Sequence, residues 1–233
     1  VTRPELAARF VRPRHSSGEL NLGFSTSAFW MRVPLQRTAD SMDYWLLVVP
    51  NSLLDEIDLY IPGQPPIYTG ASRPISQRPV FSRHFLFPVR VSNEEQMLYM
   101  RIRSSGALVV PLNLWRPVPF GQHNIISTMV QGLYQGGLIT ILIYNFLVYL
   151  TLRDRRYLLY SAYCLSMCAA MIAANGYGRL FLWPEWAVFD RISQNVFFSL
   201  AGASGVAFSA AFLILESRSP PLYRILRVLS LMQ

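Results

Sequence analysis

The sequence predicts an antiparallel β-sandwich domain followed by an all-α transmembrane helical bundle. Up to His123, apolar and polar residues alternate in short runs, the pattern of half-buried strands. Beyond His123, three segments contain no charged residue, namely 124–152, 157–178 and 192–215. A helix needs about 20 apolar residues to cross the hydrocarbon core, and all three segments reach that length. We therefore expect a sandwich domain over residues 1–118 and a membrane domain over residues 119–233.

The strands are expected in seven runs. The run 44–49 is continuously apolar, as in a strand covered on both faces, whereas the other runs alternate. Turn residues separate them, which favours an antiparallel sandwich. A long proline-rich connection occupies 62–79, and residues 116–121 are expected to form a stiff, extended hinge into the first span. The runs in chain order are 20–24, 29–35, 44–49, 57–61, 85–91, 98–103 and 108–115.

The charges flanking the three spans predict their orientation. Arg153, Arg155 and Arg156 follow the first span, whereas the loop 178–190 is mainly aromatic. Arginine-rich short loops stay in the cytoplasm, so the sandwich and the aromatic loop are expected on the opposite side. A Ser-Pro-Pro sequence at 219–221 is a plausible helix start. Residues 221–233 then predict the start of a fourth span and a larger membrane domain than the one seen here.

Small and polar residues within the first span indicate helix packing. Gly132 and Gly136 form a small-xxx-small pair, and Asn145 is a polar residue in the same span. Small residues allow close helix contact in lipid, within the bundle or across a homodimer. Intramembrane polar residues are expected to face the bundle interior. They serve either as a functional relay or simply as interhelical hydrogen-bonding groups.

One strand face of the sandwich is a candidate ligand-binding surface. Trp30 and Arg32 share one side of their strand, and Tyr99, Arg101 and Arg103 share one side of theirs. Aromatic rings stack on sugar rings, and guanidinium groups bind carboxylates or hydroxyls. The alternative is that these side chains cover a second sheet face or hold the sandwich together.

Two further arginines lie beside the proline-rich connection. Arg78 and Arg83 are candidates for the same binding groove. The alternative is that both are solvated loop residues.

The sequence contains no pattern typical of catalysis or metal binding. Its three histidines are scattered, and it has no glycine-rich phosphate loop. Cys164 and Cys168 have no histidine or carboxylate beside them within their span, so a metal site is not expected. The net charge of +8 is divided between both halves of the chain, which argues against a nucleic-acid-binding patch. We expect no active site, metal or cofactor in these residues.

Several motifs of the membrane half resemble the first half of the bacterial seven-transmembrane receptors with diverse intracellular signalling modules. Each motif is short, but the set is fairly specific. The motifs are Gly132-Leu-Tyr-Gln-Gly-Gly, Tyr144-Asn145, Leu152-Arg-Asp-Arg-Arg-Tyr-Leu-Leu-Tyr160, Asn175-Gly176 and Leu182-Trp183-Pro184.

The sandwich resembles the type-2 extracellular domain of the same receptors. One departure is Thr69-Gly70-Ala71, where an acidic residue is expected after the glycine. The resemblance implies a jelly-roll, carbohydrate-binding-like periplasmic domain, seven helices and a cytoplasmic output, commonly a diguanylate cyclase or a histidine kinase. The matching segments are Phe29-Trp-Met-Arg32, Asp58-Leu-Tyr60, Arg78-Pro79, Phe85-Leu-Phe-Pro88 and Tyr99-Met-Arg-Ile-Arg-Ser104.

The architecture and the resemblance together predict the sensory and transmembrane part of a bacterial inner-membrane receptor. The expected partners are the lipid bilayer, a periplasmic small molecule, glycan or protein, and a second copy of the chain. Cyclic di-GMP synthesis or a two-component system would then be the output of a module beyond these residues. One alternative is a periplasmic protein-interaction module without a small-molecule ligand. Another is a transporter with a periplasmic substrate domain, although no internal repeat of the transporter type is evident.

Overall fold

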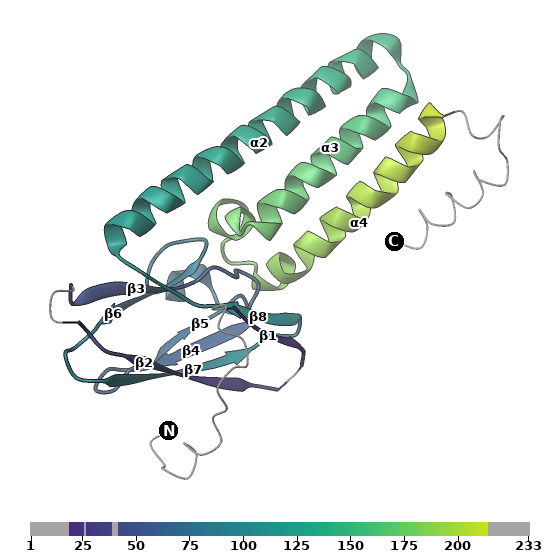
Figure 1. The fold of residues 1–233 in the computed structure, drawn as a ribbon. Helices are drawn as coiled ribbons and strands as arrows, with labels where there is room; N and C mark the ends of the chain where they lie inside the picture. Colours follow the sequence, from purple (N-terminus) through teal and green to yellow (C-terminus); the bar gives the residue numbers. More distant parts are fainter. Residues whose placement is uncertain (1–18, 26, 39–41, 214–233) are drawn as a thin grey trace. The chain divides into compact units, whose positions relative to one another are not determined.

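The computed structural model describes residues 19–25, 27–38 and 42–213 (Figure 1). The described residues form two compact units. One unit lies within Val1–Gln122 and Arg179–Arg191, and the other within His123–Gly178 and Ile192–Gln233. The predicted start of a fourth span at 221–233 lies outside the described residues.

The first unit consists of antiparallel sheets. A four-stranded sheet has the order β2-β7-β4-β5, a three-stranded sheet has the order β6-β3-β9, and β1 pairs with β8. A short 3-10 helix, η1 (Ile75–Gln77), lies between β5 and β6. The strands are β1 (Glu19–Phe24), β2 (Phe29–Leu35), β3 (Tyr44–Val49), β4 (Glu56–Tyr60), β5 (Ile67–Thr69), β6 (Phe85–Arg90), β7 (Gln96–Arg103), β8 (Ala107–Pro111) and β9 (Asn113–Trp115).

Figure 1 shows the four-stranded and three-stranded sheets in two layers, and buried side chains from both sheets form the core. Met100 on β7 pairs with Met31 on β2 and with Leu59 on β4, and it is fully buried. Leu47 on β3 and Phe87 on β6 belong to the same core cluster. Since side chains alternate between the two faces of a strand, this packing leaves the intervening residues of β2, β7 and β4 on the outer face. The predicted antiparallel sandwich is confirmed.

Strand β3 is buried on both faces, as its continuous apolar run predicts. Leu47 and Val49 face the main core. Leu46 and Val48 instead join Phe120 in a second buried cluster. Strand β3 therefore contributes side chains to both buried clusters.

The second unit contains long apolar helices: α2 (Pro117–Leu152), α3 (Arg155–Ala174) and α4 (Ala187–Phe212). Each is long and apolar enough to cross a membrane, which agrees with the predicted helical membrane bundle. The predicted extended hinge at 116–121 is wrong, because α2 already begins at Pro117. Proline is well suited to the first turn of a helix, where its missing N–H is not needed. The bounds of α2 thus reach from the first compact unit into the second.

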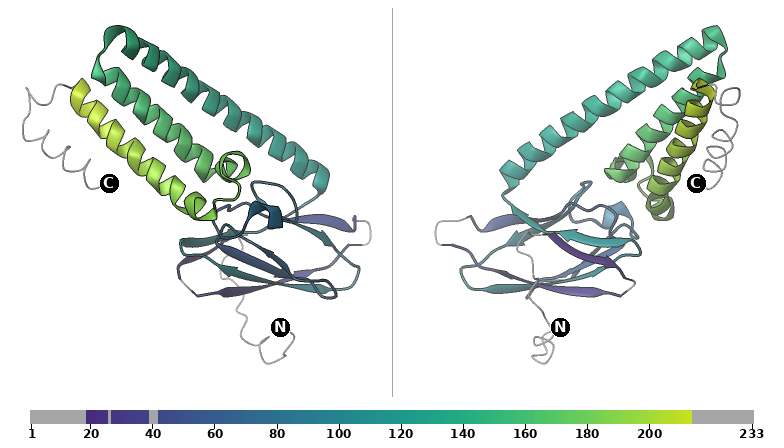
Figure 2. Two further views of the ribbon diagram at one scale, coloured as in Figure 1. Left: turned by 180° about the vertical axis from the view of Figure 1, so that it is seen from behind. Right: turned by 45° about the vertical axis from the view of Figure 1, so that its right-hand side comes forward.

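Figures 1 and 2 show α3 and α4 running side by side. A Cβ added at Gly205 on α4 would lie only 3.2 Å from Cδ2 of Tyr163 on α3. Helix α2 is joined to α3 by a hydrogen bond from Gln131 to Asn175 of 3.1 Å and by one from the Cys168 thiol to Gln135 of 3.0 Å. Polar side chains of α2 therefore make the expected interhelical hydrogen bonds.

The two glycines of the predicted packing motif in α2 do not lie at the contacts between the described helices. An added Cβ at Gly132 or Gly136 would meet nothing within 4 Å among the described residues. The Asn145 amide donates to the Ile141 carbonyl of its own helix, at 2.9 Å. Neither glycine therefore provides the expected close contact between the described helices. A contact with a second chain stays a prediction.

Candidate functional site: the outer face of the four-stranded sheet

The outer face of the four-stranded sheet carries five of the predicted ligand-binding side chains. Trp30 pairs with Arg101, and Arg32 pairs with Tyr99, across β2 and β7. Arg103 follows on the same side of β7 and is about half exposed (52%). None of the five is buried between the sheets. The structure therefore brings these residues together on one accessible surface, which we call the sheet face.

Aromatic rings form a row across the sheet face. Trp30 stacks on Tyr60 of β4 with ring centroids 5.5 Å apart, and Tyr60 meets Tyr68 of β5 edge-on at 6.4 Å. Trp30 and Tyr68 remain 40% and 48% exposed. Burial, followed by the nearby Asp58 carboxylate, raises the pKa of the Tyr60 hydroxyl. The hydroxyl is protonated at neutral pH, as an unperturbed tyrosine also is, and can donate a hydrogen bond.

Carboxylates neutralise part of the positive charge on this face. Nη1 of Arg101 lies 2.9 Å from Glu56 and 2.8 Å from Asp58, and Arg73 lies 3.2 Å from Asp58. These carboxylates raise the pKa of Arg101. Asp58 is nearly fully buried (3% exposed), so it acts as the central acceptor of the cluster. Arg101 is thus already bound within the sheet, whereas Arg103 is 3.8 Å from its nearest carboxylate oxygen, on Glu56.

Arg73 connects the sheet face to the turn that follows β5. Its guanidinium lies 5.2 Å from the centroid of the Tyr68 ring, in addition to its ion pair with Asp58. The turn itself is fixed on the start of β4, because the Ala71 N–H donates to Leu54 O at 2.8 Å and the Ser72 N–H donates to Asp55 O at 3.0 Å.

Arg179, from the connection between α3 and α4, is bound to this turn. It belongs to a π-helical turn, η2 (Gly178–Leu182), and is only 1% exposed. Its guanidinium donates to Ala71 O at 2.6 Å and also to Arg73 O. Asp190 balances its charge at 3.4 Å and accepts a 2.7 Å hydrogen bond from the Trp183 indole. Residues 179–191 are therefore part of the sandwich unit.

Arg78 and Arg83, expected either in the ligand-binding groove or in a solvated loop, lie in neither place. Both are buried (9% and 8% exposed), so the alternative of solvated loop residues is wrong. Arg78 lies 4.4 Å above the Phe85 ring and donates to Ser82 O at 2.6 Å. Burial, and next the Arg179 guanidinium, lower the pKa of Arg78 to about 10. These contacts involve the chain around β6 and Arg179, and not the sheet face.

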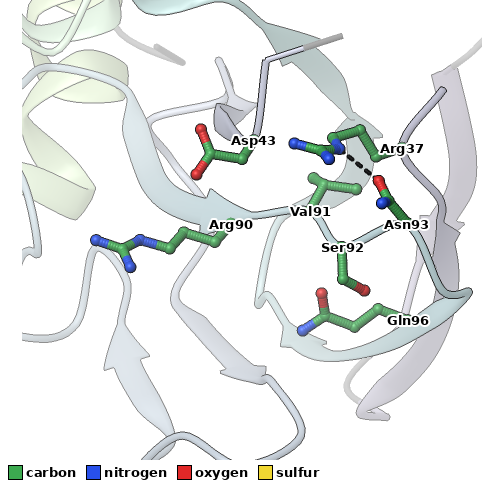
Figure 3. Close-up of a pocket in the computed structure, with 7 residues that line it drawn as sticks. All are labelled: Arg37, Asp43, Arg90, Val91, Ser92, Asn93 and Gln96. Atoms are coloured by element: carbon green, nitrogen blue, oxygen red, sulfur yellow. Dashed lines mark hydrogen bonds between the residues drawn. The ribbon is translucent and has the colours of Figure 1, made fainter. Parts of the chain in front are cut away.

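A separate, shallow groove of about 430 Å³ lies beside the ends of β2 and β6 (Figure 3). In it, Nε of Arg37 donates to the Asn93 side chain at 2.7 Å. Asp43, Arg90 and Gln96 also line it, but their charged or amide groups do not converge on one point in Figure 3. None of the predicted site residues lines this groove. Among the described residues, no group of three His, Cys, Asp or Glu side chains is arranged to hold a metal ion.

Sequence reasoning missed several residues of this site. The alternation of Ile57, Leu59 and Ile61 already implies that Asp58 and Tyr60 point outward. Arg179 is the single arginine of an otherwise aromatic loop before Asp190, which was a usable signal. Arg73 carried no local signal, because its role comes from a turn that folds back on β4.

The fold combines an antiparallel sandwich with long apolar helices, and the family matches below identify the two parts as an extracellular sensor domain and a portion of a seven-transmembrane signalling receptor. Residues 1–116 match the family described as 7TMR-DISM extracellular 2, and residues 127–233 match the family described as 7TM diverse intracellular signalling. The chain therefore belongs to the seven-transmembrane receptors with diverse intracellular signalling modules. No curated protein matches it significantly.

Proposed function

We propose that the chain is the sensory and transmembrane portion of a bacterial inner-membrane receptor. In this proposal, the sandwich lies in the periplasm and binds a glycan or an acidic small molecule on its sheet face. The binding is relayed through the helices to a cytoplasmic output, such as a diguanylate cyclase or a histidine kinase. A ligand can shift such a two-state system only by binding one state more tightly than the other.

The position of Arg73 is the observation that carries the proposal. Its side chain belongs to the sheet face, through Asp58 and Tyr68. Its carbonyl oxygen accepts a hydrogen bond from Arg179, in the connection between α3 and α4. One residue thus contacts both the candidate ligand surface and the loop that joins two spans. A displacement of this residue on ligand binding would act directly on the ends of α3 and α4.

The chemistry of the face favours a ligand with both ring faces and acidic or hydroxyl groups. Trp30 offers a partly exposed ring that stacks on Tyr60, and aromatic rings of this kind stack on sugars. Arg32 and Arg103 are exposed at either end of the same surface. Arginine binds carboxylates in a fixed, two-pronged geometry. Arg101 is assigned a supporting role, because it already holds Glu56 and Asp58.

Ligand binding is tested with two probes, an oligogalacturonate as an acidic glycan and a malto-oligosaccharide as a neutral one. Titration of the purified chain should show binding that Trp30→Ala and Arg32→Ala weaken by about tenfold or more, the equivalent of about 1.4 kcal/mol. Tyr44→Ala is the matched control, since Tyr44 is also an aromatic residue 40% exposed but lies on β3. Equal affinity for the wild type and for folded Trp30→Ala would remove the sheet face as the site.

The relay is tested by hydrogen exchange of residues 179–191 with and without the bound probe. The ligand should change the protection of this segment in the wild type. In Arg73→Ala, the ligand should no longer change it, because the side chain that reaches the sheet face is missing. Unchanged protection of 179–191 in the wild type at saturating ligand would contradict the relay.

A further inference from the structure

Residues of α2, α3 and α4 near the connection between α2 and α3 line an aromatic groove. It encloses about 230 Å³. Tyr160 of α3 meets Phe208 of α4 with ring centroids 5.1 Å apart, and Phe208 meets Phe212 at 5.6 Å. The remaining lining residues are Asn145, Arg156 and Tyr157. An apolar wall thus ends at a single cationic side chain.

The surroundings of Arg156 are strongly basic. Arg153 and Arg155 stand beside it, and Asp154 is the one acidic residue of this connection. Asp154 caps the first turn of α3 and accepts hydrogen bonds from Nε and Nη2 of Arg156, at 2.9 and 2.6 Å. Nη1 of Arg156 makes no hydrogen bond to another described residue. The ion pair orients the guanidinium beside the groove and leaves donors for a second anion.

We propose that this groove binds an anionic phospholipid, with the headgroup phosphate at Arg156 and an acyl chain along Tyr160, Phe208 and Phe212. Basic pockets between transmembrane helices are suited to anionic headgroups, and a guanidinium binds phosphate oxygens through paired hydrogen bonds. The aromatic wall continues from the cationic end along the helices, as a lipid requires. The site is independent of any ligand on the sandwich.

The occupant is identified by native mass spectrometry of the purified full chain in detergent, with equal amounts of phosphatidylglycerol and phosphatidylcholine. Phosphatidylglycerol should be retained in preference. Arg156→Gln should reduce that retention about tenfold, the effect of one lost charge-assisted hydrogen bond. Arg155→Gln removes the same charge one residue away without altering the groove lining and should leave retention unchanged. Arg156→Lys, which keeps the charge, should retain the preference for phosphatidylglycerol.

The position is identified with phosphatidylglycerol that carries a photoreactive acyl chain. Cross-links should concentrate on the peptides that contain Tyr160 and Phe208. Three results would each overturn the proposal: equal retention of both lipids, equal losses in Arg156→Gln and Arg155→Gln, or cross-links elsewhere along the helices. The last result is also expected if residues 214–233 or a second copy of the chain fill the groove.

Discussion

The backbone carbonyl of Arg73 accepts a hydrogen bond from the guanidinium of Arg179, 106 residues further along the chain. The donor belongs to the connection between two transmembrane helices, and the acceptor belongs to a turn beside the sheet face. This bond therefore places residues that follow α3 within the sandwich unit.

Loss of the Arg179 side chain should destabilise the sandwich unit. Arg179→Met removes the donor to Ala71 O and Arg73 O and the cation that balances the buried Asp190 carboxylate. Breaking a buried pair on one side costs about 3–5 kcal/mol. Chemical denaturation of the purified chain, followed by tryptophan fluorescence, measures this loss. Arg191→Met is the control. The Arg191 side chain is 49% exposed and lies as far as 4.0 Å from Asp55, so we expect a loss below about 1 kcal/mol.

The turn before Arg73 requires glycine at position 70. Gly70 has φ +142, and a Cβ there would lie 2.1 Å from the carbonyl oxygen of Asp55. Gly70→Ala should therefore lower the free energy of unfolding by more than about 3 kcal/mol. The backbone at Asp55 would have to move away from the new Cβ, and the alanine would have to adopt a strained φ. Gly63→Ala is the control, because Gly63 also has a positive φ, +76, but an added Cβ there would meet no described atom within 4 Å. Its cost should be about 1–2 kcal/mol, and equal losses for the two variants would contradict the close packing at Gly70.

Asp58 and Glu56 offer a comparison of a buried and a partly exposed carboxylate with the same partner, Arg101. Their side chains are 4% and 27% exposed. Asp58→Asn should cost about 2–3 kcal/mol, because Arg101 and Arg73 lose a desolvated acceptor. Glu56→Gln should cost less than about 1 kcal/mol. Thermal unfolding followed by near-ultraviolet circular dichroism separates the two, and a larger effect of Glu56→Gln would refute Asp58 as the central acceptor.

Close packing between α3 and α4 depends on Gly205. Gly205→Leu would force Tyr163 away from its position 3.2 Å from the added Cβ, at a cost of about 1–3 kcal/mol. Gly132→Leu is the control, because no described atom lies within 4 Å of its added Cβ. Protease resistance of the helices in detergent should fall only for Gly205→Leu. A fall for Gly132→Leu alone would instead indicate a contact outside the described residues.

The distribution of arginine predicts the membrane orientation. Reporter fusions at Gly63, in the sandwich, and at Asp154, between α2 and α3, should report opposite compartments. The fusion at Asp154 is expected to be cytoplasmic, because Arg153, Arg155 and Arg156 surround this position. Periplasmic activity of the reporter at Asp154 would reverse the assigned orientation.

The sequence predicted the sandwich and the long apolar helices because both leave local patterns, namely alternation in the strands and long uncharged segments in the helices. Met100 and Ile102 had to face a core once their neighbours Tyr99, Arg101 and Arg103 alternated with them. The same alternation placed Trp30 and Arg32 correctly on an outer face. The proline-rich start of α2 was misjudged, since proline is compatible with both an extended segment and the first turn of a helix.

The long-range contacts were outside the reach of such patterns. Arg78 is buried against Phe85 and close to Arg179, although its neighbours in sequence are typical of a solvated loop. The turn at Gly70 and Ala71 binds Arg179 through a carbonyl oxygen, and a carbonyl has no signature in a sequence. Gly132 and Gly136 are the opposite case. They form a recognisable packing motif in the sequence, but an added Cβ at either position would meet no described atom within 4 Å.

The use of carbonyl acceptors has a consequence for how such receptors can diversify. Arg179 recognises main-chain oxygens of residues 71 and 73, which any amino acid compatible with this turn supplies. The side chains on the sheet face can therefore change from one receptor to another, and ligand preference with them, while the bond to Arg179 persists. In the proposed function, recognition would depend on side chains of the sheet face and transmission on main-chain oxygens, so selection could act on the first without disturbing the second.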